Sequence, residues 1–211
     1  MTNDTISLWG EKHYHSLDYY LKNTYHEKVY RIALNAGLSC PNRDGRLDTR
    51  GCIFCSAGGS GDFAASPTLS ITEQLETEKR ILRAKRNCNK FIAYFQAFTN
   101  TYGSVEHLRD LYMQAVNDPD VVIISIATRP DCLQPEILSL LAEINEKKTV
   151  WVELGLQTIH EKTALKIRRG YPLSCFEQTV KELQKRNIPV IVHIILGLPG
   201  ESTKEVLETI E

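Results

Sequence analysis

The sequence has no long hydrophobic run and no excess of charge of one sign. No apolar stretch in its 211 residues is long enough to span a bilayer, so we expect no membrane partner. The 25 basic and 26 acidic residues give a net charge of −1, so any binding to nucleic acid must rely on a local basic face. The first ten residues hold no basic segment followed by an apolar stretch. We therefore see no secretory signal there and expect a cytoplasmic protein.

Cysteine is sparse outside one short stretch. Residues 40–55, CPNRDGRLDTRGCIFC, contain three of the six cysteines, Cys40, Cys52 and Cys55. In the cytoplasm thiols stay reduced, so a cysteine cluster indicates a metal site or catalysis more than disulfides. Structural zinc sites are closed by four protein ligands, and a ferredoxin-type cluster takes four cysteines. Three thiols with no fourth nearby in the sequence therefore indicate a metal centre with one open coordination position.

A closed zinc site is the alternative at this point. A histidine or one of the other cysteines, Cys88, Cys132 or Cys175, could complete it from a distance in the sequence. Otherwise we expect these three cysteines to be plain structural residues.

The rest of the chain alternates between two hydrophobic patterns. Apolar runs rich in β-branched and aromatic residues occupy 29–36, 91–98, 121–128, 149–156 and 188–198. The segments between them have apolar residues at helical spacing and predict helices over 71–86, 105–116, 135–147 and 174–187. Strands that are apolar on both faces and alternate with helices predict an α/β fold with a parallel sheet covered by helices.

This pattern divides the chain into a lead-in segment over 1–28 and a core over 29–211 with five strand–helix units. Residues 201–211 open a helix after the fifth strand, so we expect a sequence truncated after the fifth unit of a larger barrel. An open, doubly wound five-stranded sheet is the alternative. Both folds bind ligands at the carboxyl ends of the strands. The loops that meet there span 37–61, 99–103, 128–133, 157–162 and 197–202.

A cysteine-rich loop after the first strand, with Phe54 before the last cysteine, resembles the radical S-adenosylmethionine (SAM) superfamily. The usual motif there has three residues between its first two cysteines. The wider gap between Cys40 and Cys52 resembles the elongator catalytic subunit. The segments CPNRDG, QAFTNTY, ATRPDCL, ELGLQT and GLPGE are similar to those of the YhcC/YtqA-type radical SAM family. The resemblance implies a partial (β/α)6 TIM-like barrel with outer helices, lacking the family's sixth strand and C-terminal extension.

The same resemblance implies two cofactors. Cys40, Cys52 and Cys55 would hold a [4Fe-4S] cluster, and its open iron would bind the amino and carboxylate groups of SAM. An electron from a donor such as flavodoxin or ferredoxin would then cleave SAM to a 5′-deoxyadenosyl radical. No residue is assigned a catalytic role beyond these ligands.

Several SAM contacts are also implied. Gln157 matches the position that bonds the SAM ribose, and Arg169 matches an arginine that pairs with the SAM carboxylate. Glu153 lies on the same side of its strand as Gln157, so it is either a ribose or amine ligand or a buried carboxylate with a basic partner. The remaining expected contacts are Phe54, Gln96, Thr99, Asn100, Ile195 and Gly197.

Four further loop and strand residues have open interpretations. Ala127 stands where the elongator-like pattern ETRPD has its glutamate, so a carboxylate contact to SAM is lost there. Arg129 and Asp131 either orient each other or a substrate, or fix their loop as a salt bridge. His193 is either a satisfied core histidine or a residue that faces the substrate.

The resemblance implies transfer RNA as a partner, with modification of the wobble uridine as the reaction. A methyltransferase that acts on the product is a further expected partner. The basic segment 78–90 could supply phosphate contacts to RNA. Two alternatives stay open: a radical SAM enzyme that acts on a small metabolite, and a zinc-stabilised binding module without catalysis.

Overall fold

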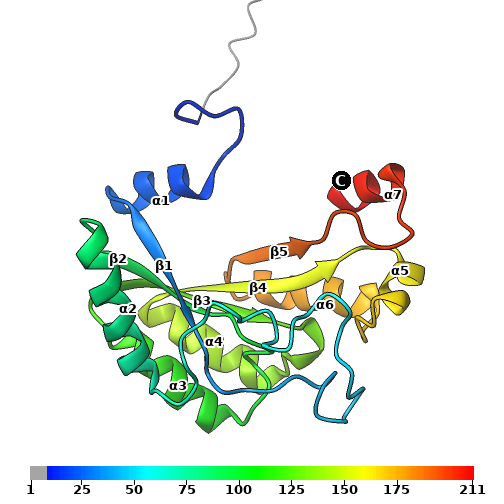
Figure 1. The fold of residues 1–211 in the computed structure, drawn as a ribbon, viewed down its shortest axis with the longest axis horizontal. Coiled ribbons are helices and arrows are strands. Elements are labelled where there is room, and N and C mark those ends of the chain that lie inside the picture. The colour runs from blue at the N-terminus through cyan, green and yellow to red at the C-terminus, as the bar shows by residue number, and fades with distance from the viewer. Residues whose placement is uncertain (1–8) are drawn as a thin grey trace, which may run out of the picture.

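The computed structural model describes residues 9–211, so residues 1–8 of the expected lead-in segment lie outside it. Five parallel strands form one sheet in the order β1-β2-β3-β4-β5, so that each strand pairs with its neighbours in the sequence (Figure 1). The strands are β1 (Val29–Leu34), β2 (Lys90–Phe95), β3 (Val121–Thr128), β4 (Thr149–Gln157) and β5 (Val190–Ile194). The five predicted strands and the parallel α/β class are confirmed.

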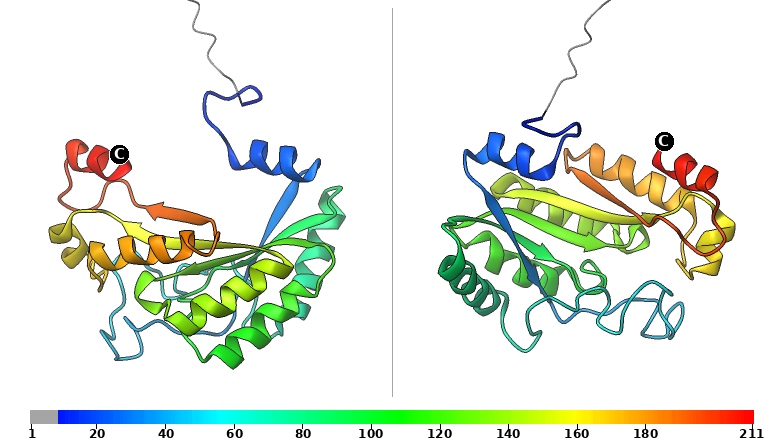
Figure 2. Two further views of the ribbon diagram at one scale, coloured as in Figure 1. Left: turned by 180° about the vertical axis from the view of Figure 1, so that it is seen from behind. Right: turned by 45° about the horizontal axis from the view of Figure 1, so that its top comes forward.

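Four longer helices lie side by side along one face of the sheet (Figure 2). They are α2 (Ile71–Lys85), α3 (Val105–Val116), α4 (Pro135–Lys147) and α6 (Leu173–Gln184). Ser70 begins α2 with a capping box, because its hydroxyl accepts from the Glu73 N–H and the Glu73 carboxylate accepts from the Ser70 N–H. Pro135 begins α4 at a position where no intrahelical N–H bond is needed. The shorter elements are the 3-10 turn η1 (Pro130–Cys132) and the helices α5 (Glu161–Lys166) and α7 (Thr203–Ile210).

Two hydrophobic cores form because successive strand residues point to opposite faces of the sheet. Ile32, Phe95 and Ile124 face the outer helices and are buried among their apolar side chains. Ile92 and Ile123 face the opposite, inner side, where they belong to a second and smaller core. The sheet is therefore covered on both faces, as a parallel sheet requires.

The inner face is closed near the amino ends of the strands by α1 (Leu17–Tyr25), a helix that the hydrophobic pattern did not predict. Leu21 packs in the same core as Ile123 and Trp151, and the Tyr20 ring lies 6.0 Å from the Trp151 ring. The described part of the lead-in segment thus plugs one end of the curved sheet. The carboxyl ends of the strands stay open for a site.

The edges of the sheet are β1 and β5, so the barrel is open between them. A curved parallel sheet with outer helices agrees with the expected partial barrel. Within residues 9–211, none of the helices combines the length and the hydrophobicity that crossing a membrane requires.

Candidate active site at the carboxyl ends of the strands

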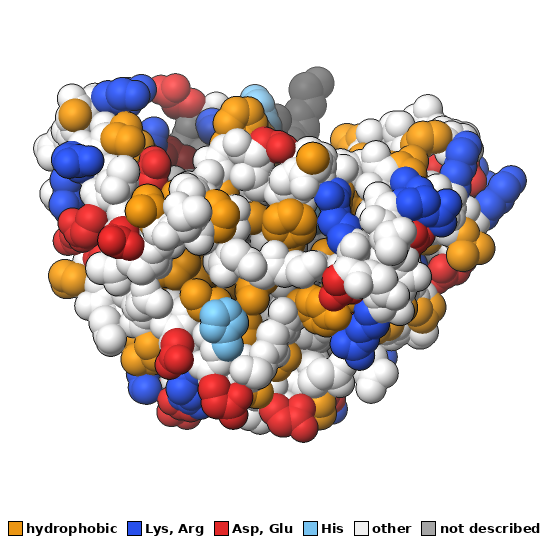
Figure 3. Space-filling view, turned by 60° about the horizontal axis from the view of Figure 1, so that its bottom comes forward, with side chains coloured by type: hydrophobic (Ala, Val, Ile, Leu, Met, Phe, Trp, Pro, Cys, Tyr) orange, Lys and Arg blue, Asp and Glu red, His pale blue; other side chains and the backbone are white. Residues whose placement is uncertain are grey.

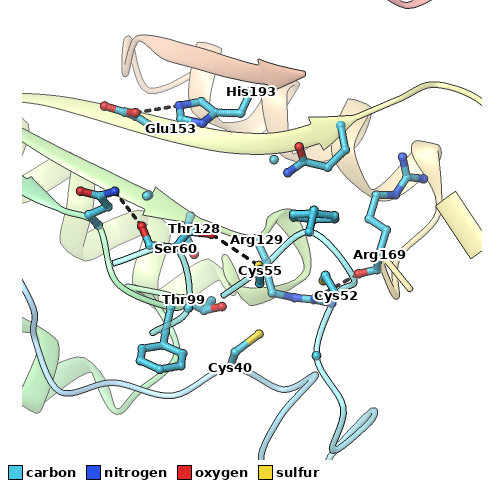
Figure 4. A pocket seen from close by; sticks show the side chains of 18 of the residues that line it. Cys40, Cys52, Cys55, Ser60, Thr99, Thr128, Arg129, Glu153, Arg169 and His193 are labelled. Atoms are coloured by element: carbon cyan, nitrogen blue, oxygen red, sulfur yellow. Dashed lines mark hydrogen bonds and ion pairs between the residues drawn. The ribbon is translucent and has the colours of Figure 1, made fainter. Parts of the chain in front are cut away.

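A cavity of about 270 Å³ opens at the carboxyl ends of the strands, under the loop that follows β1 (Figure 4). Side chains from β2, β3, β4 and β5 line it together with the cysteine loop. Nine of the predicted site residues are in its lining: Cys40, Cys52, Phe54, Cys55, Gln96, Thr99, Glu153, Gln157 and Arg169. The other three, Asn100, Ile195 and Gly197, do not line this cavity.

All six cysteines lie in the described part of the chain, and all are free thiols. Only the three of the cysteine loop line the cavity, while Cys88, Cys132 and Cys175 do not. Within residues 9–211, no three His, Cys, Asp or Glu side chains are gathered closely enough to form a finished metal site. The three thiols therefore line the same cavity, but they do not lie close enough together to form a metal site by themselves.

Arg43 holds the cysteine loop in shape from within. Its guanidinium donates to the carbonyl oxygens of Ala57 at 3.1 Å and Cys55 at 3.4 Å, and also to that of Ser56. Gly51 has a φ of +72°, and a Cβ there would lie 2.9 Å from Arg43 Nε. Only glycine suits this position, because a side chain would meet both backbone strain and the guanidinium.

Hydrogen-bond donors point at two of the three sulfur atoms. Asn42 Nδ2 donates to Cys52 Sγ at 3.1 Å and to the Arg168 carbonyl at 2.8 Å, and the Ser60 hydroxyl donates to Cys55 Sγ at 3.6 Å. The hydrogen bond from Cys52, helped by Ser60, lowers the pKa of Cys55 to about 6 against the opposing effect of burial. The same pairing raises the pKa of Cys52. Cys55 is thus the readier thiolate, which is the form that binds metals.

Arg129 places a positive charge beside the thiols. Its buried guanidinium binds the Asp131 carboxylate through Nε at 2.9 Å and Nη2 at 2.8 Å, and Nη1 donates to the Arg169 carbonyl at 3.0 Å. Burial would lower the pKa of Arg129, but Asp131 outweighs it and raises the pKa, so the side chain stays charged. The salt-bridge interpretation of this pair is confirmed. The pair ties the loop after β3 to the loop after β4.

The segment after β2 is fixed against the cysteine loop. Gln96 Nε2 donates to the Ser60 carbonyl at 2.7 Å, and the Phe98 N–H donates to the Gly59 carbonyl at 2.9 Å. A Cβ on Gly59 would overlap the Phe98 ring, and Gly59 has a φ of +61°. This contact lets the cysteine loop lie directly on the end of β2.

Thr99 and Asn100 differ in where they point. Thr99 lines the cavity, whereas Asn100 is fully buried behind it. Asn100 Nδ2 donates to the carbonyls of Phe95 and Ala127, each at 3.0 Å, and so joins the ends of β2 and β3. The Asn100 side chain supports the strand ends, and its expected contact with SAM stays a prediction.

A sequence profile described as the radical SAM superfamily matches residues 49–211, well over half of the chain. The chain belongs to the radical SAM superfamily. The chemistry of that superfamily is the cleavage of SAM with an iron–sulfur cluster. The matched region contains Cys52 and Cys55 and begins after Cys40, which agrees with the wide gap after the first cysteine.

This radical SAM chain has related sequences in bacteria. YtqA of Bacillus subtilis is 49% identical over 199 residues, which are 94% of this chain and 62% of YtqA. YhcC of Escherichia coli K12 is 42% identical over 193 residues, which are 90% of this chain and 61% of YhcC. The chain therefore spans about three fifths of the length of these curated relatives.

Two solved structures share the fold. Elp3 of Methanocaldococcus infernus, with an N-terminal deletion, superposes with a TM-score of 0.61 at 15% identity, over 86% of this chain and 41% of that one. OxsB, a cobalamin-dependent S-adenosylmethionine radical enzyme, superposes with a TM-score of 0.55 at 13% identity, over 84% of this chain and 25% of that one. These likenesses confirm the radical SAM type of partial barrel.

The donor chemistry of the cavity fits the cluster that radical SAM proteins use. Three sulfur atoms face the cavity with no fourth cysteine beside them, which suits a cluster with one open iron. His193 is the one histidine among the described residues of the lining, and it is bonded to Glu153 at 2.7 Å.

Arg169 is placed differently from what the superfamily resemblance leads one to expect. Its side chain is 1% exposed and donates to the carbonyls of Leu156 at 3.0 Å, Thr158 at 2.6 Å and Tyr171 at 3.0 Å. Figure 4 shows the guanidinium pointing away from the three thiols. The carbonyls use Nε and Nη1, and Nη2 pairs with the Glu161 carboxylate at 3.4 Å, so a pairing of Arg169 with the SAM carboxylate stays a prediction.

Gln157 lies where the backbone turns at the end of β4. It ends β4 with a φ of +66°, after an irregularity in the pairing with β5. A Cβ on Gly155 would lie 2.6 Å from Gln157 Nε2, so the glutamine side chain fills the space that glycine leaves. The Ile195 N–H donates to the Gln157 carbonyl at 3.0 Å. Ile195 and Gly197 follow β5 outside the cavity lining, and their expected adenine contacts stay predictions.

The sequence reasoning missed the residues that support the thiols. Asn42 and Arg43 follow the first cysteine by two and three positions within CPNRDG, and Ser60 follows the last cysteine by five positions. The signal was their position close to the cysteines that the sequence predicts as metal ligands, because such ligands need hydrogen-bonded neighbours.

Proposed function

We propose that this chain is a radical SAM enzyme that modifies the wobble uridine of transfer RNA. In this proposal Cys40, Cys52 and Cys55 hold a [4Fe-4S] cluster, and the rest of the cavity receives SAM. The observation that carries the proposal is that three thiols, and no fourth, line one cavity at the carboxyl ends of the strands. This is the end at which barrel enzymes bind their ligands.

When bound, the cluster supplies the electron that cleaves SAM. The chain's own residues prepare the cavity for it. Asn42 and Ser60 donate to the sulfurs, and buried Arg129 adds a positive charge that offsets the negative charge of thiolates. Gln96, Thr99 and Gln157 bring polar groups to the walls, where the polar parts of SAM need hydrogen-bonding partners.

The RNA part of the proposal rests on the sequence resemblance to the elongator catalytic subunit. The basic segment 78–90 adds less than its composition suggests. Lys79 is buried in a pair with Asp118 at 2.7 Å, and Arg83 pairs with Asp120 at 2.9 Å. The end of α2 leads into the start of β2, so the segment lies at the opposite end of the sheet from the cavity.

Exposed Arg46 of the cysteine loop is better placed for a phosphate contact near the site. Arg50 is exposed as well, but its guanidinium already pairs with the Asp48 carboxylate at 2.8 Å. On the face shown in Figure 3, Lys and Arg side chains lie mainly toward the two sides, with acidic groups along the lower rim. RNA binding would therefore use separate small basic groups, because this face carries no single broad basic field.

The test is an anaerobic reconstitution followed by iron, sulfide and zinc counts. Electron paramagnetic resonance of the reduced protein is then recorded with and without SAM. A four-iron signal that changes with SAM, and SAM cleavage that bulk transfer RNA stimulates, support the proposal. A colourless protein with about one zinc per chain favours the binding module. SAM cleavage that ignores transfer RNA but responds to a small compound favours a metabolite as the substrate.

A further inference from the structure

Each of the five strands sends one inward-facing polar side chain into a single layer inside the curved sheet. This layer lies between the apolar core that α1 covers and the cavity that the cysteines line. Its members, here called the polar layer, are Arg31, Tyr94, Ser125, Glu153 and His193.

Glu153 is the centre of the polar layer. The Ser125 hydroxyl donates to Oε1 at 2.5 Å, Arg31 Nη2 pairs with Oε1 at 3.0 Å, and His193 Nε2 bonds to Oε2 at 2.7 Å. Burial alone would raise the pKa of Glu153. The hydrogen bonds from His193 and Ser125 and the charge of Arg31 outweigh burial and lower this pKa. Glu153 is therefore a carboxylate, which can only accept hydrogen bonds.

His193 differs sharply from Glu153 in exposure. The His193 side chain is 44% exposed and that of Glu153 is 1% exposed, and both line the cavity. Because Glu153 only accepts, Nε2 of the neutral ring carries the hydrogen of their bond and Nδ1 keeps a lone pair. None of the residues that the structure describes bonds to Nδ1. The ring therefore keeps a free proton acceptor beside the cavity.

We propose that His193 is the catalytic residue that takes a proton from the substrate and returns it, and that Glu153 is its positioning residue. This proposal rests on the proposed function, because it takes the cavity as the place of reaction. The substrate class is a compound with a weakly acidic N–H or O–H group, such as the imide of a uracil ring. This deepens the assignment of wobble uridine to the same cavity.

One proton moves from the substrate to the His193 ring. An N–H bond forms at His193 Nδ1, the N–H or O–H bond of the substrate breaks, and its electron pair stays on the substrate nitrogen or oxygen. The Glu153 carboxylate compensates the positive charge of the resulting imidazolium. The other titratable groups of the polar layer are Arg31, whose guanidinium lies 4.3 Å from the centre of the Tyr94 ring, and Tyr94 itself.

A different result is expected if the hydrogen bond between His193 and Glu153 serves only to hold β5 against β4. In that case a glutamine at position 193 that still donates to Glu153 would serve as well as histidine. Glutamine keeps a hydrogen bond but cannot exchange a proton at neutral pH. The variant His193→Gln therefore separates the two roles.

The matched control is His160→Gln, because His160 also uses Nε2, bonded to the Glu205 carbonyl at 2.9 Å, and does not line the cavity. Reconstituted proteins receive SAM and bulk transfer RNA, and both 5′-deoxyadenosine and modified nucleoside are measured. We expect His193→Gln to keep SAM cleavage within about threefold and to form about 100-fold less modified nucleoside per 5′-deoxyadenosine. His160→Gln should change neither. An unchanged ratio in His193→Gln would overturn the assignment.

A second measurement needs no cluster. Nitrogen-15 NMR of the full chain, labelled at histidine, should show neutral His193 with its hydrogen on Nε2; a hydrogen on Nδ1 would overturn the assignment. If the wild-type chain cleaves no SAM or modifies no transfer RNA, the proposed function fails and the catalytic assignment fails with it, while the tautomer still tests the hydrogen bond between His193 and Glu153. If His193→Gln does not fold, Glu153→Gln takes its place in the same assay. We expect the same loss of modified nucleoside per 5′-deoxyadenosine, and an unchanged ratio of the two products would overturn the assignment.

Discussion

The side-chain amide of Asn42 lies 3.1 Å from the sulfur of Cys52 and donates a hydrogen bond to it. Asn42 is only 2% exposed, and the same nitrogen also reaches the Arg168 carbonyl at 2.8 Å. One residue of the cysteine loop therefore connects a thiol to the loop that follows α5. Asn42 therefore supports the fold, and it would also support the proposed cluster through Cys52.

Replacing Asn42 by leucine should weaken retention of the cluster. The change removes the donor to Cys52 while keeping a similar volume, and loss of such a supporting bond costs about 10- to 100-fold in metal affinity. Iron retained against a chelator, measured after reconstitution, is the readout. Asn87→Leu, at an exposed position, is the control. Equal iron retention in the two variants would contradict the role given to Asn42.

Cys55 should react faster than Cys52 with iodoacetamide at pH 7 in the cluster-free protein. Thiolates are the reactive form, and the pKa of Cys55 is lowered to about 6 while that of Cys52 is raised. At pH 7, above the lowered pKa, Cys55 is mostly thiolate, and its own rate should fall as the pH drops below about 6. Peptide mass spectrometry gives the two rates separately. Equal rates at pH 7 would show that the two thiols share their proton evenly.

Alanine at Gly59 should destabilise the chain more than alanine at Gly197. Both glycines have positive φ, so both substitutions carry a backbone cost of about 1–2 kcal/mol. Only at Gly59 does the new Cβ overlap the Phe98 ring, because nothing lies within 4 Å at Gly197. We expect the free energy of unfolding of Gly59→Ala to fall by a further 1–3 kcal/mol or so. Urea unfolding of both variants measures the difference, and equal losses would mean that the cysteine loop moves aside.

Glu153→Gln should lower the free energy of unfolding at pH 7 by about 1–3 kcal/mol, since three partners lose a charged acceptor. The pKa of Glu153 is lowered from its usual 4.5 in the folded chain. Its charged form therefore stabilises the fold above pH 4.5, and this contribution disappears as the pH falls through the lower folded value. Urea unfolding at pH 7 and near pH 4 should show the gap to wild type narrowing. The matched variant Glu177→Gln, at an exposed position of α6, should show no comparable gap.

The strands could be predicted because each is a local run of apolar residues. Their parallel orientation could be predicted because a helical segment lies between each pair of successive strands. Each apolar run is short and each intervening helix has its own apolar stripe. The helix α1 was missed because its burial depends on a distant partner, Trp151, which no local pattern reveals. The three thiols were found from their spacing. Their hydrogen-bond donors were not, because whether a polar neighbour points inward is decided by the path of the loop.

Arg169 is a case in which the sequence indicates a role but cannot show which acceptors the side chain meets. Its position in the sequence suits a carboxylate partner, but which acceptors its guanidinium meets depends on where the turn after β4 places its carbonyls. In the structure Thr158 and Leu156 present theirs at 2.6 and 3.0 Å. For Glu153, the alternation along a strand correctly places the residue on the inner face, and an unnamed basic partner was one of the two interpretations. The structure shows that this partner is Arg31, and the expected contact of Glu153 with SAM stays a prediction.

The polar layer also has a consequence for how the chain folds. Since every strand contributes one member, the layer is complete only when all five strands have joined the sheet in the right alignment. A slip of one residue in β5 would turn His193 outward and deprive Glu153 of a partner, and the cost of that buried charge would disfavour the slipped sheet. The hydrogen bonds of the polar layer therefore favour the native alignment of the strands over a shifted one. The floor of the cavity should be among the last parts of the molecule to become native.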